Sequence, residues 1–178
     1  MTLFKISLIT LAGLTTFGAF AGHHLGYRWN KTKSLPSGIY RYVPTDPALI
    51  KPGDLVMACP EDNEIQKEAR HRGYLPYGLG CAGGFAPLFK IAMALHGDQV
   101  DITPKAIQIN GQMIKNSSRL NTDSQNRELP PMPKSGVVPE DKVWLLSDYA
   151  KRSWDSRYFG PVPLNTIKGL AYPVWTFE

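Results

Sequence analysis

The chain has 178 residues, 43% of them hydrophobic and 20% charged, which is enough apolar side chain for the core of one folded domain. Its formal net charge is +5, but the 20 basic and 15 acidic residues are scattered, which argues against a nucleic-acid groove. The four histidines, His23, His24, His71 and His96, lack the spacing of metal ligands. We therefore expect no metal, no cofactor and no nucleic-acid partner.

The first 29 residues form one predicted unit, a helix that anchors the chain in a membrane. Between Lys5 and Arg28 there is no Asp, Glu, Lys or Arg, and residues 6–21 are almost wholly apolar. This uncharged span reaches the roughly 20 residues that a bilayer-spanning helix needs. A cleaved signal peptide is the alternative interpretation, because Ala19-Phe20-Ala21 has the small-x-small form of a processing site.

The charges that flank this segment and the cysteines of the chain give opposite indications of its orientation. Arg28, Lys31 and Lys33 outnumber the basic groups before the segment, so the positive-inside rule alone puts the C-terminal side in the cytoplasm. The even cysteine count instead favours export to an oxidising compartment. We expect the exported orientation, with Tyr27 and Trp29 at the membrane interface.

The second predicted unit, residues 30–178, has the pattern of a mainly β domain of short, mostly antiparallel strands. Runs bounded by Gly and Pro predict strands over residues 38–43, 54–58, 87–95, 98–102, 106–109, 112–115 and 142–146, and a turn and strand over residues 160–175. A proline-bearing turn joins the first two runs. Asn110-Gly111 predicts a type I′ hairpin. The polar, proline-bearing residues 116–139 predict an exposed loop.

Residues 59–86 form a Gly- and Pro-rich insertion in this domain. Cys59 and Cys81 lie in it, and an even cysteine count in an exported domain predicts one disulfide that closes a loop of about 20 residues. A short solvated helix is predicted over residues 61–72. Two free thiols in a cytosolic protein are the alternative. Metal binding is disfavoured because neither cysteine has a CxxC or histidine partner.

Ser34 and Lys90 are the first candidates for chemistry. Ser34 lies just after the apolar segment, in a stretch where Pro and Gly constrain an exposed turn, which suits a nucleophile but equally suits a linker. Ser37 is a rival in the same stretch. Lys90 is the one charged residue in the apolar run over residues 87–95. A lysine that is buried without a partner loses its proton more easily and can act as a base. A lysine that reaches solvent from an edge strand is the alternative.

A third candidate segment is the polar stretch over residues 147–160. Asp155 and Arg157 could form an ion pair there, and Ser153 could donate or accept a hydrogen bond. A polar surface loop has the same composition, so this segment alone indicates little about function.

In this order, the three segments resemble the signal peptidase I superfamily. That family has a membrane anchor, a serine just past it, a strand with a lysine, and a box S-x-D-S-R-x-x-G that residues 153–160 match at every specified position. Residues 52–56 resemble its Gly-Asp-hydrophobic strand. The pattern N-x-T-x-S-L-P-x-G over residues 30–38 resembles the TraF branch, the peptidases of conjugative plasmid transfer. One departure is Ile91, where the family usually has a basic residue after the lysine.

The resemblance implies a signal peptidase-like antiparallel β domain with one N-terminal transmembrane helix, and acyl transfer by a Ser/Lys dyad. It implies these roles: Ser34 as nucleophile, Lys90 as general base, Thr32 as an oxyanion donor beside the Ser34 backbone N–H, Ser153 as the holder of the lysine amine, and Asp155 with Arg157 as supporting residues.

The resemblance also implies a biological role. The expected protein is a serine endopeptidase of the bacterial inner membrane, with its catalytic domain in the periplasm, that processes a pilin precursor for a conjugative secretion system. The acyl-enzyme is resolved by water or by the pilin's own amino terminus, which would give a circular product. The alternatives are a general signal peptidase for exported proteins and a catalytically silent β domain of the transfer apparatus.

Overall fold

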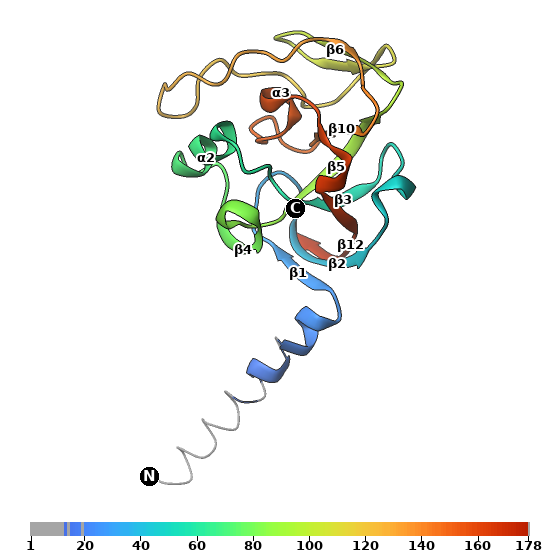
Figure 1. Cartoon of the computed structure of the whole chain (residues 1–178). Helices are drawn as coiled ribbons and strands as arrows, with labels where there is room; N and C mark the ends of the chain where they lie inside the picture. The colour runs from blue at the N-terminus through green and yellow to red at the C-terminus, as the bar shows by residue number, and fades with distance from the viewer. Residues whose placement is uncertain (1–12, 14, 19, 178) are drawn as a thin grey trace.

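The structure, a computed structural model, describes residues 13, 15–18 and 20–177 (Figure 1). The strands are β1 (Tyr27–Asn30), β2 (Ser37–Pro44), β3 (Leu55–Ala58), β4 (Tyr77–Cys81), β5 (Leu88–Leu95), β6 (Gln99–Ile102), β7 (Ile107–Ile109), β8 (Gln112–Met113), β9 (Gly136–Val137), β10 (Lys142–Leu146), β11 (Val162–Pro163) and β12 (Ile167–Phe177). The helices are α2 (Glu64–His71) and α3 (Ser156–Phe159), and the 3-10 turns are η1 (Pro47–Leu49), η2 (Ala82–Gly84) and η3 (Leu164–Thr166). The predicted mainly β class is therefore confirmed.

Two antiparallel sheets carry the fold. The larger has seven strands in the order β1-β2-β12-β3-β5-β10-β11, and the smaller has four in the order β8-β7-β6-β9. The smaller sheet lies at the end of the domain farthest from the N-terminal helix (Figure 1). The first two predicted strands, β2 and β3, do not pair with each other, because the C-terminal strand β12 lies between them and pairs with both.

Two glycines allow the backbones of β2 and β12 to approach each other closely. A Cβ atom on Gly169 of β12 would lie 2.2 Å from the Val43 carbonyl oxygen of β2. At the other end of the same pair, a Cβ atom on Gly38 would lie 2.1 Å from the Trp175 carbonyl oxygen. Both glycines have positive φ angles, 157° and 149°, a region that glycine reaches at little steric cost. Any other residue at either position would push the two strands apart.

The hairpin between β7 and β8 has the predicted type I′ turn. Asn110 and Gly111 both have positive φ angles, 51° and 79°, as this turn requires. The predicted loop over residues 116–139 is only partly exposed. Ser117 is 1% exposed, and residues 136–137 form β9 on the edge of the smaller sheet.

The insertion over residues 59–86 contains the disulfide and the helix that the sequence predicted. Cys59 and Cys81 are bonded, with Cα atoms 5.5 Å apart. Helix α2 begins after Asn63, whose side chain accepts a hydrogen bond from the Gln66 backbone N–H and caps the helix. Ala69 of α2 packs with Leu75, Phe85, Trp154 and Tyr158, so the insertion shares a core with the segment around α3.

The predicted membrane anchor falls largely on residues 1–12, 14 and 19, which lie outside the described residues. Within the described part of the chain, no helix is both long and apolar enough to cross a membrane. A helix precedes β1 and projects from the domain (Figure 1). Tyr27 and Trp29, which we assigned to the anchor unit, belong to the edge strand β1, so the predicted boundary after residue 29 falls inside a strand.

Candidate active site

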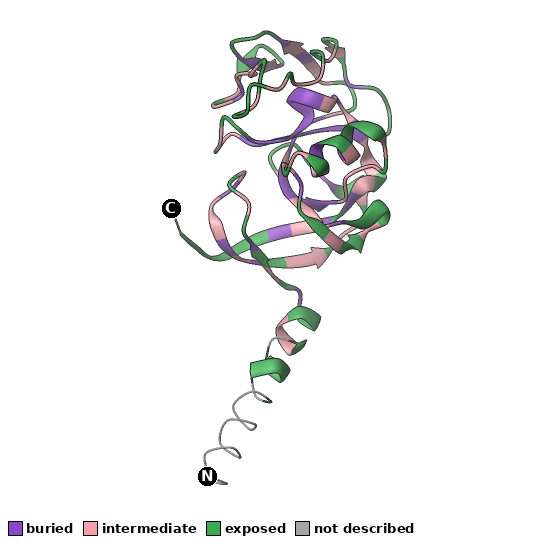
Figure 2. Cartoon of the chain, turned by 90° about the vertical axis from the view of Figure 1, so that its left-hand side faces the viewer, coloured by how far each residue is buried: buried purple, intermediate pink, exposed green. Residues whose placement is uncertain are grey.

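Lys90 lies in an interior strand of the larger sheet. Strand β5 runs between β3 and β10, and Lys90 pairs with Val56 of β3. The side chain of Lys90 is 3% exposed. It therefore does not reach solvent from an edge strand. Figure 2 shows the same burial in the strands that form the centre of the domain.

Among the described residues, the buried amine has one hydrogen-bond partner, the Ser153 hydroxyl, at 2.9 Å. Burial lowers the pKa of Lys90 from 10.5 to about 8, because the ammonium loses its hydration. The nearby Asp155 carboxylate raises this pKa and the Arg157 guanidinium lowers it, both by less than burial does. A substantial fraction of the amine is therefore neutral near pH 8, which is the form that a general base requires.

Ser34 lies on a turn between β1 and β2 that buried groups hold in place. Leu35, next to it, is 4% exposed and packs in a core cluster with Tyr40. The Asn30 side-chain amide donates to the carbonyls of Leu35 and Pro36 at 3.3 and 3.1 Å, and the Tyr40 hydroxyl donates to the Pro36 carbonyl at 2.7 Å. The turn is therefore part of the folded core and not a free linker.

The structure brings Ser34 and Lys90 together through Ser153. The Ser153 hydroxyl donates to Ser34 Oγ at 3.2 Å and accepts from Lys90 Nζ at 2.9 Å. The three side chains come from the β1–β2 turn, from β5 and from the segment before α3, which lie far apart in the sequence. This chain of contacts joins a hydroxyl nucleophile to a base of lowered pKa, the arrangement needed for nucleophilic catalysis.

Thr32 lies beside this turn, but its hydroxyl is engaged. The Asn30 amide nitrogen donates to carbonyls, so its oxygen is the acceptor, and it receives the Thr32 hydroxyl at 2.8 Å and the Thr32 backbone N–H at 3.0 Å. A hydroxyl has a single proton, so Thr32 must turn away from Asn30 to donate to an oxyanion. The Ser34 backbone N–H has no acceptor within the described part of the chain and is free to donate.

Asp155 and Arg157 form a buried ion pair behind Ser153. Both side chains are 0% exposed, and the guanidinium contacts the two carboxylate oxygens at 2.7 and 3.0 Å. Arg157 also donates to the carbonyls of residues 116, 118, 147 and 151. The predicted pair is present, but the alternative of a polar surface loop is wrong. The buried pair ties the loop after β10 to the loop after β8, and these hydrogen bonds offset the cost of burying the charges.

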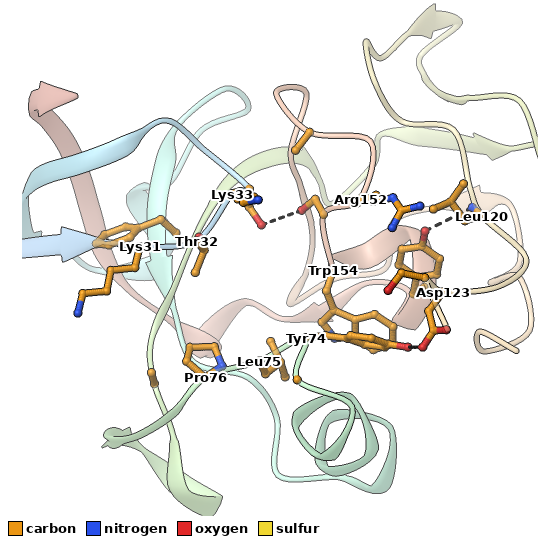
Figure 3. A pocket seen from close by; sticks show the side chains of 18 of the residues that line it. Lys31, Thr32, Lys33, Tyr74, Leu75, Pro76, Leu120, Asp123, Arg152 and Trp154 are labelled. Carbon is orange, nitrogen blue, oxygen red and sulfur yellow. Dashed lines mark hydrogen bonds between the residues drawn. The ribbon is translucent and has the colours of Figure 1, made fainter. Parts of the chain in front are cut away.

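A cleft of about 850 Å³ opens over Ser34 and Ser153 (Figure 3). Thr32 and Lys33 lie on one side of it, and Tyr74, Arg152 and Trp154 lie on the other. The insertion contributes residues 73–76 and 86 to the lining, and Pro87 follows directly after it. Among the described residues, no group of three or more His, Cys, Asp or Glu side chains could hold a metal ion.

Two residues of this arrangement were missed by the sequence reasoning. Asn30 stood in the quoted N-x-T-x-S pattern without a role, and it is the side chain that organises the nucleophile turn. Ser147 stood in the third candidate segment, and its hydroxyl donates to the Ser34 carbonyl. Only the pattern could have indicated Asn30. Nothing in the sequence indicates that Ser147 contacts residue 34.

The family model described as signal peptidase, peptidase S26, matches residues 1–176. The chain belongs to this family. It is 43% identical over 177 residues to the conjugal transfer protein TraF of Agrobacterium tumefaciens, with 99% of this chain and 96% of that protein covered. It is 42% identical to TraF of Agrobacterium fabrum, with 96% and 92% covered, and 33% identical to the plasmid transfer protein TraF of Escherichia coli, with 89% and 88% covered.

A solved signal peptidase I from Enterococcus faecalis has a TM-score of 0.40 and 20% identity, over 68% of this chain and 95% of that one. The resemblance that the motifs indicated, to signal peptidases and to TraF, is confirmed by the family model and the curated relatives. The family is described as one of signal peptidases, and the three relatives are named as conjugal or plasmid transfer proteins.

Proposed function

We propose that this S26 family member is a serine endopeptidase that cuts a pilin precursor for a conjugative transfer system. The observation that carries the proposal is the contact chain from the buried Lys90 amine through Ser153 to Ser34 Oγ, at the wall of a cleft of about 850 Å³. The relatives named TraF, similar over nearly the whole chain, support a role in conjugation. The pilin substrate rests on the resemblance to the TraF branch.

The proposed mechanism uses the contacts between Lys90, Ser153 and Ser34. When Lys90 is neutral, the two hydroxyls reverse their hydrogen bonds, so that Ser34 donates to Ser153 and Ser153 donates to the amine. The proton of Ser34 then reaches Lys90 by way of the Ser153 hydroxyl while Ser34 Oγ forms a bond to the scissile carbonyl carbon. The Ser34 backbone N–H donates to the oxyanion, and Thr32 joins it when its hydroxyl leaves Asn30. The C–N bond then breaks, and the Lys90 ammonium returns its proton to the departing amine.

The acyl-enzyme that results has two fates. Water gives a linear mature pilin, and the amino terminus of the pilin itself gives a circular one by forming a new peptide bond. The first step is the same for both products, so the dyad serves either reaction.

We also propose that the enzyme acts at the periplasmic face of the inner membrane, with residues 1–29 as its anchor. The apolar composition of residues 6–21 and the disulfide between Cys59 and Cys81 support this location. The nucleophile turn begins directly after β1, at Lys31, ten residues beyond the end of the apolar segment at Ala21. A substrate leaving the bilayer in an extended form would meet the cleft close to the membrane surface.

Co-expression with the pilin precursor from the same transfer region tests the proposal. Mass spectrometry of the pilin is expected to show a shortened product with the intact enzyme and only precursor with Ser34→Ala or Lys90→Ala. Ser37→Ala is the matched control, because Ser37 pairs with Phe177 in the sheet and does not line the cleft. A product lighter than the linear chain by one water indicates cyclisation. Full processing by either dyad variant would refute the mechanism.

A further inference from the structure

Every polar group of Ser147 is hydrogen-bonded, and the residue lies buried between the nucleophile turn and the Asp155–Arg157 pair. It follows β10 directly and is 0% exposed. Its backbone N–H donates to Asp155 at 3.1 Å, and its carbonyl accepts from Arg157 at 2.8 Å. The backbone of Ser147 is therefore held by the buried ion pair, while its hydroxyl remains for another partner.

The hydroxyl proton of Ser147 has one acceptor. The backbone N–H groups of Tyr149 and Ala150 both donate to Ser147 Oγ, each at 3.2 Å. These two bonds occupy the oxygen lone pairs, so the single proton points away from them and donates to the Ser34 carbonyl. The contact therefore has a fixed direction.

This contact supplies what the rest of the nucleophile turn lacks. Asn30 holds the carbonyls of Leu35 and Pro36, but within the described chain the Ser34 carbonyl accepts only from Ser147. The orientation of this carbonyl sets the backbone angle ψ of Ser34, which fixes the plane of the peptide on its C-terminal side relative to the Cα–Cβ bond that carries Oγ. A nucleophilic hydroxyl that is displaced by about 1 Å from its productive position can lose about a hundredfold in rate.

We propose that Ser147 is a positioning residue for the nucleophile. Its hydroxyl locks the Ser34 peptide so that Oγ stays in contact with Ser153, and it transmits the rigidity of the Asp155–Arg157 pair to the nucleophile turn. Ser147 does not line the cleft, so it has no contact with substrate. The inference rests on the proposed peptidase function.

Kinetics of the full-length chain in detergent micelles test the proposal, with a synthetic peptide that spans the cut site of the pilin precursor as located by mass spectrometry. Ser147→Ala removes only the hydroxyl, and we expect kcat to fall roughly tenfold to a hundredfold with KM unchanged. Ser147→Cys keeps nearly the same volume with a weaker donor, and we expect a smaller loss of kcat. This second variant keeps the test decisive should the alanine variant fold poorly.

Ser117→Ala is the matched control. Ser117 is 1% exposed, and its hydroxyl likewise donates to a backbone carbonyl, that of Ile114 at 2.6 Å, and accepts from a backbone N–H, that of Ile107 at 2.9 Å. It supports the smaller sheet and has no contact with Ser34. We expect its melting temperature to fall as much as that of Ser147→Ala, with kcat within twofold of the unsubstituted enzyme.

The pH profile separates positioning from a merely structural effect. Ser147 does not contact Lys90, so the midpoint of the rise of kcat with pH is expected to stay where it is in Ser147→Ala. A shifted midpoint would trace the loss to the Asp155–Arg157 pair and overturn the inference, as would unchanged kcat in both Ser147 variants or a rise in KM alone. Failure of the unsubstituted enzyme to cleave the peptide would instead count against the proposed function.

Discussion

Replacing Lys90 with methionine is expected to make the protein inactive and more stable at pH 7. The folded state lowers the pKa of Lys90 from 10.5 to about 8, because the buried ammonium loses its hydration. A shift of this size corresponds to roughly 3 kcal/mol of unfavourable free energy for the charged, folded form. Methionine cannot form the hydrogen bond that Lys90 donates to Ser153, and losing this bond costs about 1 kcal/mol of stability. The net gain in stability is about 2 kcal/mol.

The gain depends on pH in a way that identifies its cause. Between pH 8 and 10.5 the unfolded chain binds more protons at Lys90 than the folded chain does, so the stability of the unsubstituted protein rises through this window. Below pH 8 the full cost is present. The methionine variant lacks this rise, so the stability difference is largest near pH 7 and shrinks as the pH approaches 10.

Thermal unfolding of the full-length proteins, followed by tryptophan fluorescence from pH 7 to 10, measures this difference. For a chain of this size, about 2 kcal/mol corresponds to a rise in Tm of roughly 4–8 °C at pH 7. The described residues include no free cysteine, so disulfide exchange does not disturb the alkaline points. Parallel curves for the two proteins across this range would refute the reasoning, because they would mean that folding leaves the pKa of the amine unchanged.

Further predictions concern the groups around the amine and the disulfide of the insertion. The activity is expected to rise with pH through a midpoint of about 8, and Ser153→Ala is expected to lower kcat sharply while leaving KM unchanged in steady-state assays. Asp155→Asn leaves the Arg157 guanidinium buried without its carboxylate, so urea unfolding should show a loss of roughly 3 kcal/mol. The same variant should move the activity midpoint to lower pH, because Asp155 raises the pKa of Lys90; an alkaline shift would contradict this. The double variant Cys59→Ser/Cys81→Ser should lose about 3 kcal/mol in the same unfolding assay, and an unchanged midpoint would show that the disulfide adds no stability.

The local features of the fold were predictable because neighbouring residues decide them. Asn110-Gly111 forms its turn through its own backbone preferences. Helix α2 begins at Glu64, three residues after the predicted start, and Asn63 caps it. The pairing of strands was not predictable, since β12 comes last in the chain and enters between β2 and β3. Short strands pair by shape and register with partners far away in the sequence, and no local pattern encodes which partner that is.

The sequence alone also identified the candidate residues, but through their order and not through their individual settings. Ser34 read alone suited a linker, Lys90 suited a surface lysine, and residues 153–160 suited an exposed loop. The match to a family pattern identified all three segments together as parts of one candidate site. The chemistry of a Ser/Lys pair requires those residue types, whatever lies between them.

Only the tertiary structure decided what these groups can do. The pKa of a lysine depends on its hydration and on the charges near it, and both are set by strands and loops that meet only in the folded chain. Burial of Lys90 between β3 and β10 lowers its pKa, and Ser153 connects it to Ser34. The contact of Ser147 with the Ser34 carbonyl joins residues 113 positions apart. Such a contact exists only once the sheet has formed.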